Sequence, residues 1–173
     1  MRYFTEKLWR ELNSLDPKIV STADEAWAGN MRAYEAQLES LLPRMGKRNQ
    51  RFWSDYVYRL HDGDVVRIAV GDTLAADVVC KRPRSWRSGA MIEIVAWDGF
   101  LYTLKYMAIE SLDMCLKSSG DPSAGTLFEQ WGYSELTAEH VAAFRHSILF
   151  ASGGEVSIVF NRFSYQRARL PKT

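Results

Sequence analysis

Glu93 has the clearest potential for chemistry in this sequence. It precedes an Asp98-Gly99 pair that lies between two apolar runs, and Asp-Gly in that position is typical of a two-residue β-hairpin turn. Such a turn puts Glu93 on one face of the hairpin together with Tyr102 and Tyr106. A carboxylate enclosed by tyrosine rings suits acid or base catalysis, or the binding of a basic ligand group. The alternative is a partly exposed glutamate, or one paired with a lysine or arginine, because the spacing ties no second carboxylate to it.

His146 is a further candidate ligand-binding residue, because it alternates with apolar residues of a predicted strand. Its alternative role is that of a hydrogen-bonded histidine at the edge of the core. The pair His61-Asp62 is similar to a metal-ligand signature of phosphohydrolases, but further histidines and aspartates at helical spacing are missing. We therefore expect that pair to cap an element or to shape a turn. His140 is expected in a surface turn.

The sequence lacks the usual motifs for covalent catalysis, phosphate binding and metal binding. It has no G-x-S-x-G elbow, no P-loop and no dinucleotide-binding fingerprint. Its two cysteines, Cys80 and Cys115, form no C-x-x-C pair, so we expect reduced, buried thiols. These observations assign no catalytic residue, and they favour a protein that is not an enzyme and uses no cofactor or metal.

Basic residues gather in three stretches without acidic neighbours, within residues 44–51, 81–87 and 162–172. The middle stretch places a tryptophan among arginines and is predicted to be a loop. Arginine and tryptophan often anchor protein interfaces, and the same side chains could contact phosphates or stack on a base. We favour a protein partner over nucleic acid, and plain solvent exposure is the alternative. The candidate partner-binding residues of this loop are Arg82, Arg84, Trp86 and Arg87.

Residues 1–60 show helical periodicity. Thr5 can cap a short first helix. Asp16-Pro17 can begin a long second helix, whose apolar positions recur every three or four residues as far as residue 42. Pro43 ends that helix. A third helix is predicted from Arg48 to Leu60.

After residue 61 the hydrophobic period changes to two, which indicates strands. Strands are predicted at 65–70, 74–80, 91–97, 100–106, 110–116, 144–151 and 156–165. Short loops join them without intervening helices, so the sheet should be mostly antiparallel and meander-like. The predicted fold class is α+β, with N-terminal helices (1–60) packed on a β part (61–173) in one compact domain. The sequence leaves three possibilities for the aromatic face of the hairpin. It is covered by these helices, it is covered by another copy of the chain, or it is open to solvent.

Charge and composition exclude several classes of protein. The 173 residues include 22 basic and 21 acidic side chains, a net charge of +1, and 47% of the residues are hydrophobic. This balance is unlike that of a strongly basic nucleic-acid-binding protein, an acidic mimic of nucleic acid or a disordered chain. No apolar run is long enough for a membrane span, and the charged first residues are unlike a secretory signal. We therefore expect a cytoplasmic protein without a membrane partner.

Several loose motifs, taken in order, resemble an uncharacterised bacterial family of short cytoplasmic proteins, a domain of unknown function. The resemblance covers nearly the whole chain, except the arginine-rich loop and the second predicted strand. The motifs are the Met1-Arg2-Tyr3-Phe4-Thr5 start with Leu8-Trp9, Trp27, His61-Asp62, Asp98-Gly99 with Tyr102, Trp131-Gly132-Tyr133, and the run from His146 to Glu155.

Small α+β proteins of this kind are similar to immunity proteins, which neutralise a cognate toxin by covering it. The resemblance therefore implies a non-enzymatic binding protein whose partner is a protein such as a bacterial toxin. Two alternatives stay open. One is a small-molecule or nucleotide-binding domain that uses the aromatic hairpin face, and the other is an enzyme with an unrecognised site.

Overall fold

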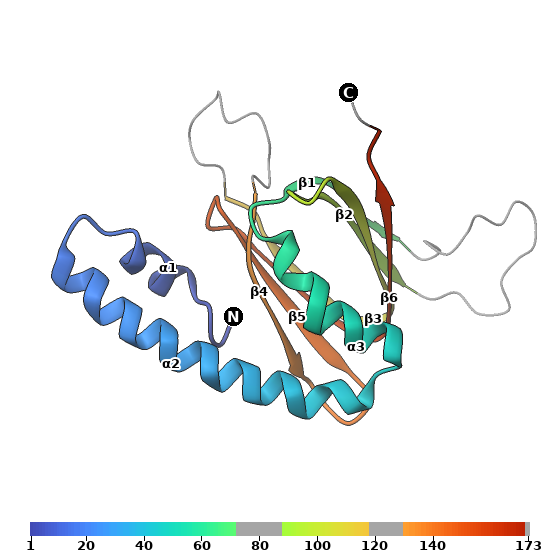
Figure 1. Ribbon diagram of the computed structural model, residues 1–173. Coiled ribbons are helices and arrows are strands. Elements are labelled where there is room, and N and C mark those ends of the chain that lie inside the picture. The colour runs from blue at the N-terminus through green and yellow to red at the C-terminus, as the bar shows by residue number, and fades with distance from the viewer. Residues whose placement is uncertain (72–87, 118–129, 172–173) are drawn as a thin grey trace, which may run out of the picture.

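The computed structural model of the chain describes residues 1–71, 88–117 and 130–171. In these residues the helical segments come first and six antiparallel strands follow (Figure 1). The strands form one open sheet in the order β1-β2-β3-β6-β5-β4. The fold class is therefore α+β with an antiparallel sheet, as predicted.

The first two helices begin at the predicted caps. In α1 (Glu6–Leu12) the Thr5 hydroxyl accepts a hydrogen bond from the backbone N–H of Leu8 at 3.3 Å. In α2 (Pro17–Leu41) the Asp16 carboxylate accepts one from Lys18 at 2.9 Å, and proline occupies the first helical position. α1 lies along the first part of α2, away from the sheet (Figure 1). The most extensive contact of this helix pair with the sheet is between α2 and β4, and Glu6 of α1 lies close to Gly153 in the β5–β6 turn.

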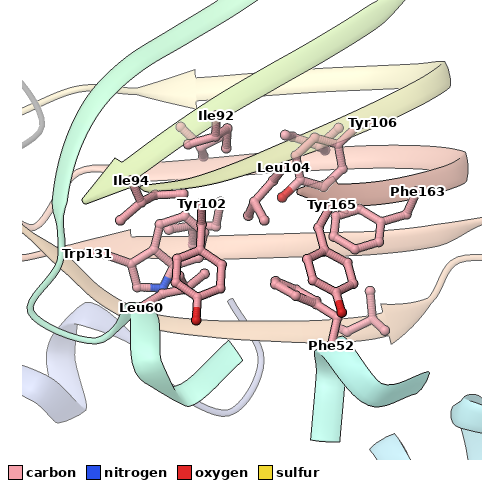
Figure 2. Packing of buried hydrophobic residues seen from close by; sticks show 14 of the residues in the cluster. Phe52, Leu60, Ile92, Ile94, Tyr102, Leu104, Tyr106, Trp131, Phe163 and Tyr165 are labelled. Carbon is pink, nitrogen blue, oxygen red and sulfur yellow. The ribbon is translucent and has the colours of Figure 1, made fainter. Parts of the chain in front are cut away.

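A third helical segment covers one face of the sheet and supplies much of the core. After the short turn η1 (Leu42–Arg44), α3 (Lys47–Arg51) continues through a π-helical turn η2 (Phe52–Tyr56) into a 3-10 turn η3 (Val57–Leu60). Phe52, Trp53 and Leu60 are at most 1% exposed. Figure 2 shows Phe52 and Leu60 facing the side chains of the sheet. The predicted helix over 48–60 is confirmed, and its apolar face is the one that packs.

The sheet is built around two long central strands. Its members are β1 (Asp64–Gly71), β2 (Gly89–Val95), β3 (Phe100–Cys115), β4 (Trp131–Ala138), β5 (Phe144–Phe150) and β6 (Glu155–Arg169). β3 is one continuous strand where two strands, at 100–106 and 110–116, were predicted. The register of β3 against β6 shifts just after the gap between them, next to Ala108, whose φ is 54°. β4 was not predicted, and the predicted strand at 74–80 lies outside the described residues.

The β2–β3 hairpin has a register that differs from the predicted one. Its loop contains three residues, because the backbone N–H of Ala96 donates to the Phe100 carbonyl at 2.9 Å. Gly99 takes a φ of 78°, the left-handed conformation that ends this kind of loop. Tyr102 consequently pairs with Ile94, one residue away from the partner that a two-residue turn would give. A shift of one residue exchanges the two faces of one strand relative to the other.

Two hydrophobic clusters form the core, and Leu38 of α2 packs against both of them. The larger one fills the space between the 47–60 segment and the sheet, and it encloses Tyr102 and Tyr106, which are 0% and 1% exposed (Figure 2). The smaller cluster holds Tyr3, Phe4 and Tyr34 against β4. The tyrosines of the aromatic hairpin face are thus covered by the chain's own helical segment, whereas Trp97 in the hairpin loop is 66% exposed.

Candidate partner-binding surface

Tyr106 and His146, two of the predicted ligand-binding residues, contact each other inside the core. The Tyr106 hydroxyl lies 2.7 Å from His146 Nδ1, and both side chains are at most 1% exposed. Burial lowers the pKa of His146 to about 3 and raises the pKa of Tyr106 well above its usual value. The Trp53 ring stands perpendicular to the imidazole, with ring centroids 4.8 Å apart. His146 is therefore a neutral, hydrogen-bonded core histidine, the role that the sequence left as the alternative.

Glu93 does not share a face with the tyrosines, and this part of the prediction was wrong. It pairs with Thr103, because the three-residue loop shifts the register by one, and so it lies on the face away from the core. Its carboxylate is 3.9 Å from the Arg67 guanidinium and its side chain is 23% exposed. Glu93 is thus the arginine-paired glutamate that the sequence offered as an alternative.

The remaining candidates for chemistry have structural surroundings. His61 Nδ1 lies 3.0 Å from the Asp62 carboxylate, in the turn between η3 and β1, where Asp62 has a φ of 60°. His140 is exposed and lies 2.9 Å from Glu110. Within the described residues, no group of three or more His, Cys, Asp or Glu side chains is placed to hold a metal ion.

The prediction for the thiols was wrong in one of the two positions. Cys115 is free and exposed, because it is the last residue of the long strand β3 and the preceding Asp113 and Met114 are exposed as well. Cys80 lies outside the described residues, and so does the arginine-rich loop with Arg82, Arg84, Trp86 and Arg87. For that loop, partner binding stays a prediction.

Four arginines from distant parts of the sequence gather where the 47–60 segment meets the β2–β3 hairpin and the end of β6. Three of them follow one another at helical spacing along the segment, and the fourth comes from β6. We call this group the arginine surface. It consists of Arg48, Arg51, Arg59 and Arg167.

Tyr56 is the centre of this surface. Its ring is 7% exposed, and the guanidinium carbons of Arg51, Arg59 and Arg167 lie 5.5, 5.7 and 4.7 Å from the ring centroid. Arg48 stacks in the same way on Tyr165, at 5.2 Å. These distances are within the range of cation–π attraction, which favours a guanidinium over the face of an aromatic ring. The aromatic rings therefore hold several like charges close together.

Asp98 joins the surface to the hairpin. Its carboxylate is 7% exposed, accepts hydrogen bonds from the Phe100 N–H at 3.2 Å and the Tyr102 hydroxyl at 2.8 Å, and lies 3.6 Å from Arg59. Burial, and then the bond to Asp98, raise the pKa of Tyr102 to about 12. The hydrogen bond with Tyr102 in turn raises the pKa of Arg167.

The positive charges of the arginine surface are only partly balanced. Asp98 pairs with Arg59, and Asp55 lies 3.6 Å from Arg51. Among the described residues, Arg48 and Arg167 have no carboxylate within ion-pair distance. Four guanidinium groups therefore meet two carboxylates. Arg48 and Arg167, which have no such partner among the described residues, are both exposed, so water reaches the excess positive charge.

Part of this surface is visible in the sequence as basic stretches. Two of the three basic stretches, at 44–51 and 162–172, supply Arg48, Arg51 and Arg167. The sequence does not indicate that these two stretches lie together. They meet because β6 lies beside β3 in the sheet, and this strand order brings Arg167 to the helical segment. Arg59 belonged to no stretch, and only its helical spacing from Arg48 and Arg51 connects it with them.

Comparisons of the chain with protein-family models, with curated proteins and with solved structures give no match. The resemblance to a family of unknown function and to immunity proteins therefore stays a prediction. In the part of the chain that the structure describes, no helix has both the length and the apolar character that a membrane crossing requires.

Proposed function

We propose that this chain is a non-enzymatic binding protein that acts in the cytoplasm and contacts a protein partner through the arginine surface. The observation that carries the proposal is the set of three guanidinium groups around the Tyr56 ring at the protein surface. Arginine and aromatic side chains dominate the binding energy of many protein interfaces. Two exposed aromatic residues, Tyr58 at 56% and Trp97 at 66%, extend from the same segment and the same hairpin loop.

We prefer this proposal to the alternative of a small-molecule site on the aromatic hairpin face, because Tyr102 and Tyr106 are enclosed by the 47–60 segment. A narrower form of the proposal follows from the resemblance given by the sequence. In that form the chain is an immunity-type protein, and the partner is a bacterial toxin that it neutralises by direct contact.

Site-specific cross-linking tests the general proposal. A photo-reactive phenylalanine analogue replaces Tyr58 in one version of the chain, and in the control version it replaces Ala33, which is exposed on α2. We expect the Tyr58 version to form a cross-link to one defined protein in the cells that naturally make the chain, and the Ala33 version to form none. Cross-links to the same protein from both positions, or from Ala33 alone, would overturn the proposed surface. No cross-link from Tyr58 would overturn the proposed function.

Growth rescue tests the narrower proposal. A toxin gene next to the gene for this chain is expressed together with the chain, and growth is measured. We expect the natural chain and an Arg32→Gln/Arg67→Gln control to restore growth, because Arg32 lies on α2 and Arg67 pairs with Glu93. The Arg59→Gln/Arg167→Gln variant should lose rescue. Equal rescue by both variants would contradict a role for the arginine surface.

A further inference from the structure

We infer that the arginine surface takes an acidic segment of the partner, in which at least two aspartate or glutamate side chains lie close together. This inference rests on the proposed function and names the chemistry of the partner. It begins from the charge of the surface. Around Tyr56, three guanidinium groups face Asp55 and Asp98, and Asp98 is 7% exposed and already bonded to Phe100 and Tyr102.

The guanidinium groups are held in place before any partner arrives. Arg167 lies between two rings, with its guanidinium carbon 4.7 Å from the Tyr56 centroid and 4.7 Å from that of Phe100. Arg48 donates a hydrogen bond to the Tyr165 carbonyl at 2.7 Å, and Arg59 donates to the Asp55 carbonyl at 3.3 Å. Side chains that are already ordered lose little conformational entropy on binding. Planar guanidinium groups also match carboxylates through paired hydrogen bonds.

The same details favour carboxylates of a protein over the phosphates of a nucleic acid. Nucleic-acid surfaces combine positive charge with free aromatic faces on which bases stack. Here the Tyr56 and Tyr165 rings are 7% exposed and are covered by guanidinium groups, and Arg59 also lies over the exposed ring of Tyr58. Among the described aromatic side chains of this surface, Trp97 is the exposed ring without a guanidinium group over it. Asp55, whose side chain is 54% exposed, lies within the surface and repels a continuous phosphate chain.

Fluorescence polarisation with the purified chain tests the inference without knowledge of the partner. The probes are a fluorescein-labelled peptide of alternating aspartate and glycine, and an oligothymidylate of the same length and label. We expect the peptide to bind in low salt, and to bind more weakly as sodium chloride screens the charges over about 10 Å at 0.1 M. In the Arg59→Gln/Arg167→Gln variant the dissociation constant should rise by about tenfold or more. The Arg32→Gln/Arg67→Gln control loses the same total charge and should change by less than about threefold.

Three outcomes would overturn the inference. They are no binding of the peptide, an equal loss in the two double variants, or tighter binding of the oligothymidylate. Because Arg167 packs between two rings, thermal unfolding is measured for each variant, and Arg51→Gln/Arg59→Gln replaces the first variant if that one does not fold. If Tyr58 still cross-links to one protein while the peptide does not bind, the proposed function stands and only the acidic partner is wrong. If the peptide binds and Tyr58 forms no cross-link, the proposed function fails.

Discussion

Acidification should destabilise this protein through His146, well above the pH at which carboxylates are protonated. Burial lowers the pKa of His146 from about 6.5 to about 3, and the Tyr106 hydroxyl contacts its Nδ1 atom. A protonated ring would also need an acceptor at Nε2, and among the described residues that atom has none. The folded protein therefore binds the proton much more weakly than the unfolded chain does.

The sign and size of the effect follow from proton linkage. A base whose pKa is lower in the folded state contributes its full stability above the pKa of the unfolded chain, and that stability falls as the pH decreases toward the folded pKa. Each unit between about 6.5 and about 3 is equivalent to about 1.4 kcal/mol. Between pH values of about 7.5 and 5, the free energy of unfolding should therefore decrease by about 2 kcal/mol.

Urea unfolding followed by tryptophan fluorescence measures this decrease. With a denaturant slope of about 2 kcal/mol per molar, the midpoint should move by about 1 M urea. Carboxylates with lowered pKa values, such as Glu6 and Glu139, lose most of their contribution at pH values below their ordinary pKa of 4.5, and the small part lost above it is common to the natural chain and the variants. The other two histidines, His61 and His140, are present in the natural chain and in each variant described below, so the comparison between these proteins isolates His146.

The controls are His146→Gln, which keeps a neutral hydrogen-bonding group beside Tyr106, and His146→Phe, which keeps a ring in the core. Both variants will differ from the natural chain in absolute stability, so the comparison is made between their pH dependences. We expect each variant to lose about 2 kcal/mol less than the natural chain between the two pH values. An equal loss in the natural chain and in a folded variant would refute the assignment of the effect to His146.

Three further substitutions test how the chain holds its elements. Glu135→Ala removes the acceptor for the backbone N–H groups of residues 2–4, so the free energy of unfolding should fall by about 1–3 kcal/mol. Hydrogen exchange of those amides should accelerate, and unchanged exchange would contradict the anchoring of the N-terminus by Glu135. Gly99→Ala forces a side chain into a left-handed position and should cost about 1–2 kcal/mol in urea unfolding. Gly29 lies in the interior of α2 with open space around a new methyl group, so Gly29→Ala should instead stabilise the protein by about 0.5–1 kcal/mol. A lower free energy of unfolding for Gly29→Ala would refute this expectation.

Local patterns in the sequence determined the helices and much of the sheet. The Thr5 and Asp16 caps and the 48–60 helix are short-range features, and they form as predicted because neighbouring residues decide them. Alternation likewise identified β2, β5 and β6. β4 was missed because its sequence shows no clean alternation of apolar and polar residues. Its register shifts between Trp131 and Tyr133, and the charged residue Glu135 is buried, where it bonds to the start of the chain.

The faces of the hairpin and the grouping of the arginines were decided only by the tertiary structure. One extra residue in the loop, Trp97, moves Glu93 away from the tyrosines, since a strand has a period of two and a shift of one exchanges its faces. The strand order β3-β6 carries Arg167 to the helical segment that holds Arg48 and Arg59. From the sequence alone one can count these charges. Arg51 and Arg59 reach Tyr56 from the same helical segment, whereas Arg167 is more than a hundred positions away from it in the sequence. Local periodicity does not encode that contact.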